Sequence, residues 1–325
     1  PTIFAKAIVG SEDYDAQVAE LAARDASVDE IYAALVTRDI QEACDVLRPA
    51  WELAAGGDGF VSVEVSPDLA NDTEGTLAEV REWVKRVDRS NLLVKIPATR
   101  EGVPAIRRAL GEGLSINVTL IFSLARYREV MEAYLTGLEE FARTGGDVST
   151  LASVASFFVS RVDTEVDRRL EEIGTEEALA MRGTAAVANA RVAYREFLDT
   201  FRGPRWERLA GDGARLQRPL WASTSTKNPD FPDTLYVDTL VAPDTVNTMP
   251  ISTIEAYQDH GDPHPTPFGE AEIAQARETL NDLERIGIDY RGVVQVLEDE
   301  GVDKFAGSFR ELLADIASER ERLKG

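Results

Sequence analysis

The sequence predicts an α/β fold built as a (β/α)8 barrel of the TIM type, with extra helices at its C-terminal end. Short apolar, β-branched runs alternate with longer segments of helical periodicity, which is typical of parallel strands joined by helices. Residues 92–96 are apolar on both faces, as a strand buried between two layers would be. Polar residues also stand near the ends of several predicted strands, where such barrels hold their active sites.

Six strands are expected, at residues 60–65, 92–96, 115–121, 151–158, 220–224 and 235–241. The first alternates strictly, with three valines on one face and Glu64 on the other, so Glu64 is expected to face the barrel centre. The third alternates in the same way, with Asn117 and Thr119 on its polar face. Eight strands close a barrel of this type, so two more are expected upstream of Pro1. An open doubly wound sheet is the alternative, but no Gly-rich phosphate loop supports it.

Helices are expected at residues 11–23, 28–56, 71–87, 101–110, 123–141 and 162–201, the last of them broken near Gly174. Their apolar residues recur three and four positions apart. The 71–87 helix has a cap-like start, Asn71-Asp72-Thr73-Glu74, and the 101–110 helix is stopped by Gly111-Glu112-Gly113. A Gly- and Pro-containing stretch, 203–218, leads to the next strand. Residues 244–250 are expected to form a loop, and the remainder helices with turns near Gly287 and Gly301.

The composition of the chain excludes several classes of partner and site. The 325 residues include 58 acidic and 35 basic ones, for a net charge of −23, which argues against nucleic-acid and membrane partners. An anionic substrate would therefore need a local group of cations. Cys44 is the only cysteine and falls at an apolar helix position, so we expect a core residue rather than a nucleophile. His260 and His264 are the only histidines, which argues against a catalytic zinc site. No membrane span or signal peptide is visible, so the cytoplasm is expected.

Lys95 is the one charged residue in the apolar 92–96 strand. A buried ammonium loses hydration and must be paired or give up its proton. Near the end of a barrel strand, such an amine is suited to attack a sugar ketone and form a Schiff base. The alternative is a lysine whose ammonium simply reaches solvent from the strand end.

Further polar residues converge on the same predicted faces. The inward-facing set is Glu64, Lys95, Asn117, Thr119, Ser156 and Ser225. Five strands each contributing polar groups favour a catalytic centre, although a buried Glu–Lys pair kept for structure is the alternative. Two cations, Arg161 and Lys227, follow strand ends, and phosphate sites in this fold commonly lie near the loops after strands 7 and 8. The alternative for these two is a solvated surface charge.

The sequence resembles bacterial-type transaldolases over essentially its whole length. The motifs that carry the resemblance are Val63-Glu64-Val65-Ser66-Pro67, Asn91-Leu92-Leu93-Val94-Lys95-Ile96-Pro97-Ala98-Thr99, Ile116-Asn117-Val118-Thr119-Leu120-Ile121-Phe122-Ser123, Ser156-Phe157-Phe158-Val159-Ser160-Arg161 and Thr245-Val246-Asn247-Thr248-Met249-Pro250. The opening Pro1-Thr2-Ile3-Phe4 is similar to the segment that follows the family's second strand. The resemblance implies a class I aldolase barrel that needs no metal or cofactor.

The implied reaction transfers a dihydroxyacetone unit in the non-oxidative pentose phosphate pathway. The donor would be sedoheptulose 7-phosphate or fructose 6-phosphate, and the acceptor glyceraldehyde 3-phosphate or erythrose 4-phosphate. By the resemblance, Lys95 forms the Schiff base, Glu64 and Thr119 hold the water that relays protons, and Asn117 and Ser156 bind hydroxyls of the three-carbon unit.

The resemblance also implies a phosphate grip made of Arg161, Ser225 and Lys227, with Lys227 standing where relatives often have arginine. Phe158 would line the pocket and exclude water. An aspartate acid/base on the first strand and an asparagine on the second are expected in the segment before Pro1.

We expect one barrel domain over residues 1–325, N-terminally incomplete, with residues 242–325 as a C-terminal helical extension packed on it. A monomer or homodimer that binds sugar phosphates is expected. Two other functions stay open: an aldolase that releases free dihydroxyacetone, and a catalytically inactive barrel that serves as a binding protein.

Overall fold

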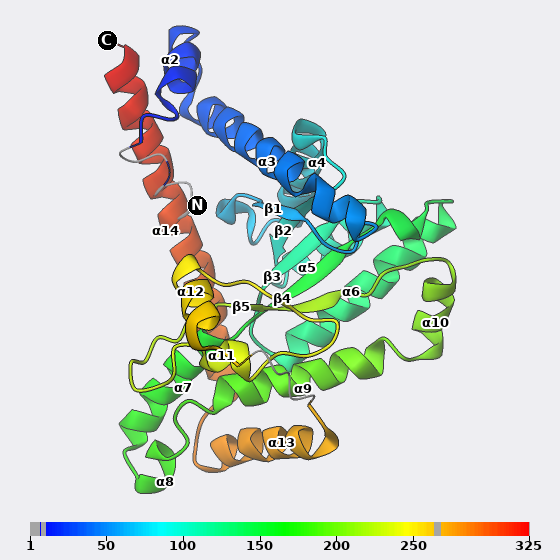
Figure 1. Cartoon of the computed structure of the whole chain (residues 1–325), viewed down its shortest axis with the longest axis vertical. Coiled ribbons are helices and arrows are strands. Elements are labelled where there is room, and N and C mark those ends of the chain that lie inside the picture. The colour runs from blue at the N-terminus through cyan, green and yellow to red at the C-terminus, as the bar shows by residue number, and fades with distance from the viewer. Residues whose placement is uncertain (1–6, 8–10, 263–267, 325) are drawn as a thin grey trace. The chain divides into compact units, whose positions relative to one another are not determined.

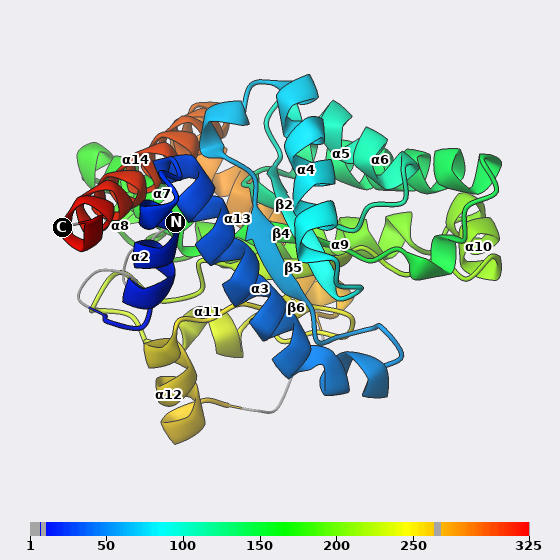
Figure 2. The same ribbon diagram turned by 90° about the horizontal axis from the view of Figure 1, so that it is seen from above.

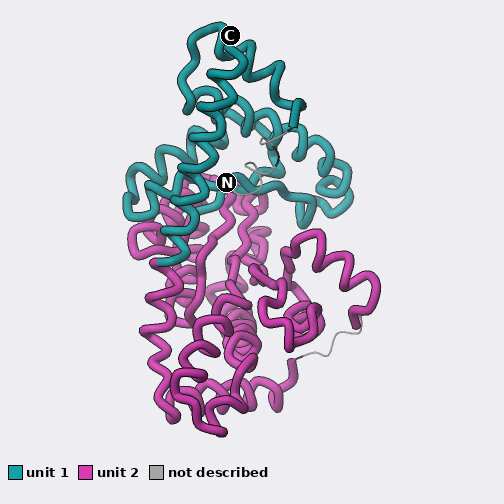
Figure 3. Tube along the Cα trace, turned by 90° about the vertical axis from the view of Figure 1, so that its left-hand side faces the viewer, with its two compact units in different colours: residues 1–96, 300–325 teal, residues 97–299 magenta. Residues whose placement is uncertain are grey.

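The computed structural model describes residues 7, 11–262 and 268–324. The chain divides into two compact units, Pro1–Ile96 with Glu300–Gly325, and Pro97–Asp299 (Figure 3). Strands alternate with helices along the chain in both units (Figure 1). The opening Pro1-Thr2-Ile3-Phe4, which is similar to the segment after the family's second strand, lies outside the described residues. No helix in the described ranges combines the length and apolar character needed to cross a bilayer.

The first unit holds two parallel strands and the helices around them. Its elements are α2 (Asp15–Ala23), α3 (Val28–Leu53), β1 (Val61–Glu64), η1 (Pro67–Leu69), α4 (Thr73–Val87), β2 (Leu92–Pro97) and the C-terminal part of α14 (Tyr290–Lys324). β1 and β2 pair in parallel from Val61↔Leu92 to Glu64↔Lys95. Helix α3 begins with a capping box between Ser27 and Glu30 and packs against β1 and α4 (Figure 2).

The core of this unit joins helices from both ends of the chain. Val18 of α2 and Leu35 of α3 pack in one buried cluster with Leu312 and Ile316 of α14. Cys44 is buried on α3, and burial raises the pKa of its thiol to about 11, which confirms the expected core position.

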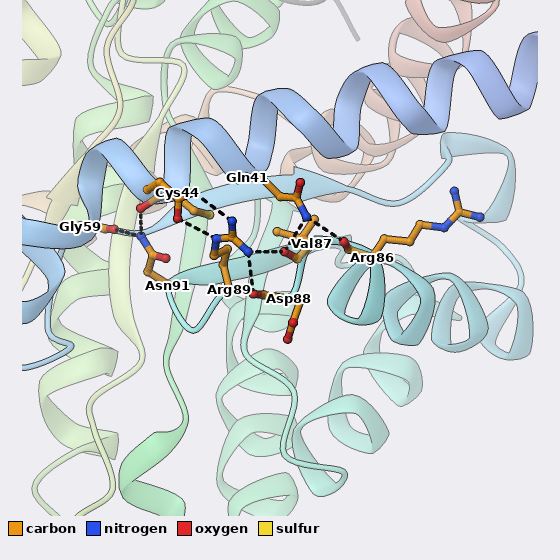
Figure 4. Close-up of polar contacts among 9 residues, drawn as sticks. Gln41, Cys44, Gly59, Arg86, Val87, Asp88, Arg89 and Asn91 are labelled. Atoms are coloured by element: carbon orange, nitrogen blue, oxygen red, sulfur yellow. Dashed lines mark hydrogen bonds and ion pairs between the residues drawn. The ribbon is translucent and has the colours of Figure 1, made fainter. Parts of the chain in front are cut away.

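A buried asparagine fixes where β2 begins (Figure 4). The Asn91 amide donates to the carbonyl oxygens of Cys44 at 2.9 Å and Gly59 at 3.0 Å. Two residues earlier, the Arg89 guanidinium grips both carboxylate oxygens of Asp45, at 2.7 and 2.9 Å. These bonds tie the turn before β2 to α3 and to Gly59, two residues before β1. They therefore set the position of the strand that carries Lys95.

The second unit holds the strands β3 (Ile116–Ile121), β4 (Ser153–Phe158), β5 (Arg218–Ala222) and β6 (Val246–Asn247), which pair in parallel in that order. Its helices are α5 (Gly102–Gly111), α6 (Leu124–Arg143), η2 (Val148–Thr150), α7 (Ser160–Ile173), α8 (Glu176–Leu179), α9 (Ala185–Thr200), α10 (Pro204–Gly211), α11 (Leu235–Asp238), α12 (Ile251–His260), α13 (Glu270–Arg285) and the first part of α14. Figure 1 shows α5 beside α6 and α13 beside α9. Parallel strands connected by helices confirm the predicted TIM-type α/β class.

The two faces of β4 differ, as its alternation predicts. Phe157 lies on the face that packs on the helices, edge-to-face with Tyr127 of α6 at 5.7 Å and with Trp221 of β5 at 6.1 Å between ring centroids. Ser156 and Phe158 lie on the opposite face. The apolar core of this unit thus forms between the sheet and its helices and leaves the other face for polar groups.

The prediction of a last strand at residues 235–241 is wrong. The structure has the short helix α11 there, with Tyr236 and Val237 buried, and the last strand is β6, inside the expected 244–250 loop. An apolar run this short does not distinguish strand from helix. The Thr234 hydroxyl donates to the Asp238 carboxylate at 2.6 Å across the helical turn, whereas β6 continues into Thr248, whose N–H bonds the Trp221 carbonyl at 3.0 Å.

Two further expectations need correction. The 203–218 stretch contains α10, which begins with Pro204 in its first turn, where proline is well tolerated. The turn expected near Gly301 does not form, because α14 runs through it from Tyr290 to Lys324. Buried neighbours such as Leu297 and Ala306 hold that helix together, and their packing outweighs the cost of about 1 kcal/mol that an internal glycine carries. His260 ends α12, and His264 lies outside the described residues.

Candidate functional site

Lys95 and Glu64 form an ion pair across two neighbouring strands. The Lys95 Nζ lies 3.5 Å from a Glu64 carboxylate oxygen. The two residues are register partners in parallel strands, so their side chains leave the sheet on the same face. Lys95 is the one residue of β2 that is not fully buried, and about a quarter of its side chain is exposed. The pair is thus shielded from bulk solvent yet reachable.

A cavity of about 450 Å³ opens beside this pair, within the first unit. Its lining comes from α3, β1, β2 and α14 and includes Tyr32, Ser62, Glu64, Lys95 and Phe309. Tyr32 and Phe309 meet edge-to-face with ring centroids 5.2 Å apart. This is enough room for a small polyol, with an amine and a carboxylate on its wall and aromatic rings opposite.

Two aromatic residues of α14 at this site were not predicted. The ring centroid of Phe305 lies 5.9 Å from Lys95 Nζ, at the outer limit of a cation–π contact. Phe309, one helical turn later, lines the cavity. Their i, i+4 spacing marks one helix face, but nothing in the sequence says which strand that face meets.

In the second unit, Asn117 of β3 and Ser156 of β4 meet on the sheet face opposite the helices. The Ser156 hydroxyl donates to the Asn117 side-chain carbonyl at 2.7 Å, and both residues are buried. Thr119 follows Asn117 on the same side of β3. Its side chain is only 1% exposed, and its hydroxyl has no hydrogen-bond partner among the described residues. A buried hydroxyl without a partner is costly, and a site that binds water or substrate accounts for it.

The backbone just after Thr119 is strained. Leu120 adopts φ +58°, in the left-handed region that bulky residues avoid, and the register between β3 and β4 shifts between Val118 and Ile121. Such conformations persist where the surrounding structure enforces them and are frequent at functional sites. The distortion interrupts the regular pairing of β3 with β4 at the position of the predicted polar group, Thr119.

Phe158 and Arg161 lie together where β4 leads into α7. The guanidinium carbon of Arg161 lies 5.3 Å from the centroid of the Phe158 ring. That ring also packs on Phe122, with centroids 5.2 Å apart. The aromatic contact holds a planar cation in the first turn of α7, where it is suited to grip a phosphate.

Ser225 and Lys227 lie in the loop between β5 and α11. The Lys227 ammonium donates to the Ser225 hydroxyl at 2.5 Å, and the lysine side chain is exposed. The start of this loop is fixed to β6, because the Thr224 hydroxyl donates to the Asn247 side-chain carbonyl at 2.8 Å. A hydroxyl and an ammonium on an anchored loop are two of the groups that bind phosphate.

The structure describes every residue that the sequence singled out for the site. Glu64 and Lys95 belong to the first unit. The second unit holds Asn117, Thr119, Ser156, Phe158, Arg161, Ser225 and Lys227. Four direct contacts link residues of this set, namely Glu64 with Lys95, Asn117 with Ser156, Phe158 with Arg161, and Ser225 with Lys227. Within the described part of the chain, no three His, Cys, Asp or Glu side chains are grouped as a metal site requires.

Comparison with known proteins gives a consistent result. The family model described as "Transaldolase/Fructose-6-phosphate aldolase" matches residues 1–316. A protein named "Transaldolase" from Thermobifida fusca is 56% identical over 320 residues, which cover 98% of this chain and 86% of the relative. Proteins of the same name from Acidothermus cellulolyticus and Mycobacterium tuberculosis are 55% and 56% identical, over 100% and 97% of this chain and 87% and 84% of their own lengths.

Proposed function

The chain belongs to the transaldolase/fructose-6-phosphate aldolase family, and from that premise we propose that it is a transaldolase whose nucleophile is Lys95. It transfers a dihydroxyacetone unit from sedoheptulose 7-phosphate or fructose 6-phosphate to glyceraldehyde 3-phosphate or erythrose 4-phosphate. The observation that carries the assignment of the nucleophile is the partly shielded Lys95–Glu64 pair on the wall of a cavity.

The Lys95 amine attacks the C2 carbonyl of the donor and gives a carbinolamine. Loss of water from that adduct forms the iminium. Cleavage of the C3–C4 bond releases the first aldose, while the proton of the C4 hydroxyl leaves to a base and the electron pair of the broken bond passes into the iminium as an enamine. The enamine carbon then adds to the aldehyde of the acceptor, the new alkoxide takes a proton, and hydrolysis frees Lys95.

Glu64 is assigned to the proton transfers at the nitrogen and at the departing water. A carboxylate 3.5 Å from Nζ can accept a proton from the Lys95 ammonium, which frees the amine to attack, and can later return a proton to the carbinolamine hydroxyl. Thr119 is assigned to hold the water that relays those protons. Its partnerless buried hydroxyl supports this assignment.

The remaining residues are assigned to binding. Asn117 and Ser156 hydrogen-bond hydroxyls of the three-carbon unit, and their mutual bond orients them for it. The phosphate is bound by Arg161, Ser225 and Lys227. The two cations among them, Arg161 and Lys227, supply the local positive charge that an anionic substrate needs in a chain of net charge −23. Phe158 covers the site against water, so that the enamine waits for an aldehyde.

Trapping with sodium borohydride tests the nucleophile. Fructose 6-phosphate and borohydride are expected to leave a stable adduct on Lys95, which is located by peptide mass spectrometry. The chain has only six lysines, and peptide mass spectrometry distinguishes Lys95 from the other five. Lys95→Met is expected to abolish both labelling and turnover. The control is Lys304→Met, which removes an exposed lysine paired with Glu300 on α14 and is expected to change neither.

Labelling at another lysine, or none, would contradict the assignment. The same assay separates transfer from simple aldol cleavage, because a transaldolase consumes fructose 6-phosphate rapidly only when an aldose acceptor is present. Rapid release of free dihydroxyacetone without acceptor would favour the aldolase. We further propose that the enzyme works in the cytoplasm as a monomer or homodimer, which sedimentation of the purified chain would distinguish.

A further inference from the structure

The loop that carries Ser225 and Lys227 is anchored at both ends to the first turn of α7, which carries Arg161. At its start, the Ser160 N–H donates to the Ser223 carbonyl at 2.9 Å, and the two serine hydroxyls also lie 2.9 Å apart. Ser223 has φ +57°, so this anchor holds the chain in a conformation that serine rarely adopts. The first attachment therefore immediately precedes Arg161 in sequence.

The second attachment lies at the other end of the loop. The Tyr236 hydroxyl, on α11, donates to the Asp163 carboxylate at 2.8 Å. Both side chains are about 2% exposed. The second Asp163 oxygen accepts the Ala186 N–H at 2.7 Å, so this carboxylate also holds the start of α9. Ser160 and Asp163 flank Arg161, and their partners Ser223 and Tyr236 flank Ser225 and Lys227.

A third contact supports the same loop. Asp167, one helical turn after Asp163, accepts the Gly183 N–H at 2.9 Å. The ring of Phe231, from the loop, packs so closely on Gly183 that a Cβ there would lie 2.7 Å from it. Gly183 also has φ +73°, so both its conformation and its contact need glycine. The two buried aspartates thus hold a platform on which the loop rests.

We infer that Asp163 and Tyr236 are positioning residues for phosphate: their hydrogen bond holds Arg161 and the Ser225–Lys227 loop as one preassembled phosphate site. Neither the Asp163 nor the Tyr236 side chain needs to touch the substrate. The inference rests on the proposed function, because it takes Arg161, Ser225 and Lys227 to be the phosphate ligands. A buried hydrogen bond between rigid elements suits this task, because it removes the freedom that binding would otherwise have to restrict.

Tyr236→Phe tests the inference, since it deletes one hydroxyl and keeps the ring. Turnover is measured with fructose 6-phosphate and with fructose as donors, each with D-glyceraldehyde as acceptor, so that only the donor phosphate differs. Loss of one buried hydrogen bond predicts a fall of about 3- to 10-fold in kcat/KM for fructose 6-phosphate, mostly through KM. The value for fructose is expected to stay unchanged. Asp163→Asn is expected to produce the same selective loss more weakly, since an amide can still bond both partners.

Tyr134→Phe is the matched control. Tyr134 is a buried tyrosine of α6 whose hydroxyl donates to the Arg215 carbonyl at 2.5 Å, before β5 begins, and its loss is expected to affect both donors equally. If the parent chain is active and Tyr236→Phe lowers kcat/KM equally for both donors, or for neither, the inference is wrong. The proposed function would still stand in that case. A folded parent chain that turns over neither donor and is not labelled at Lys95 would overturn the proposed function, and the inference with it.

Discussion

The Lys95 ammonium and the Glu64 carboxylate lie 3.5 Å apart, at register-matched positions of two adjacent parallel strands. An ion pair of this kind stabilises a protein little once the cost of desolvation is counted. In the proposed mechanism the two groups instead act as a nucleophile and a base, and the first prediction follows from that proposal.

Glu64→Gln is expected to lower kcat by about 10²- to 10³-fold, because the amide cannot exchange the protons that iminium formation requires. The stability of the chain is expected to change little. Steady-state kinetics and chemical denaturation measure the two effects. Glu300→Gln, which breaks an exposed Glu–Lys pair on α14, is the control and is expected to change neither. A large fall in stability with normal turnover would make the pair structural.

Thr119→Val is expected to separate function from stability. The hydroxyl has no partner among the described residues, so replacing it with a methyl group should leave the free energy of unfolding unchanged or raise it by about 1 kcal/mol. Turnover is expected to fall because, in the proposed mechanism, the Thr119 hydroxyl holds the water that relays protons. Thr76→Val is the matched control. Thr76 is equally buried, but its hydroxyl donates to the Leu69 carbonyl at 2.8 Å, so its loss should destabilise the fold. Equal destabilisation by both changes would contradict the assignment.

Lys227→Ala is expected to raise KM for fructose 6-phosphate about fivefold, the effect of roughly 1 kcal/mol from an exposed cation. Because Lys227 is exposed, the difference between parent and variant should shrink as salt is added. Lys227→Arg should retain or improve the KM, since a guanidinium can bind phosphate through two N–H groups. An equal change in KM for fructose would show that the lysine does not bind phosphate.

Asp163 gives a pH-dependent prediction. Burial raises the pKa of its carboxyl from 3.8 to about 6, against the hydrogen bonds from Ala186 and Tyr236, which lower the pKa. A raised pKa means that the folded chain holds this proton more tightly than the unfolded chain does. This residue's contribution to the free energy of unfolding therefore falls as pH rises from about 4 to about 6.

Asp163→Asn removes that contribution. The melting temperature of the variant relative to the parent chain is thus expected to be higher at pH 7 than at pH 4. Thermal unfolding at the two pH values measures the difference in melting temperature between variant and parent. The contributions of groups that titrate equally in both chains cancel in this difference. If the difference in melting temperature between variant and parent does not change with pH, Asp163 has an ordinary pKa.

Much of the fold was predictable because local patterns and packing agree. The cap at Asp72 starts α4, and Gly174 in the left-handed region ends α7. Glu64 could be placed on the inner face because the first strand alternates, whereas Lys95 was placed there because it is the one charged residue of an otherwise apolar strand. The structure has a helix at residues 235–238, where a strand was predicted, and a strand at 246–247, where a loop was predicted. This difference was not predictable, because a short apolar run carries no periodicity that distinguishes helix from strand. Phe305 was missed for another reason. Its place beside Lys95 depends on how α14 packs, and that packing is encoded in distant contacts rather than in the helix itself.

The bonds made by Asn91 reach residues 32 and 47 positions earlier in the chain. Contacts this far apart form only after the intervening loops have closed. We therefore expect the strand that carries Lys95 to take its final position only after α3 and Gly59, two residues before β1, have come together. A nascent or partly folded chain carries Lys95 as an ordinary flexible amine, without a carboxylate beside it. In the proposed mechanism, the pairing of amine and carboxylate on which catalysis depends therefore requires the finished structure.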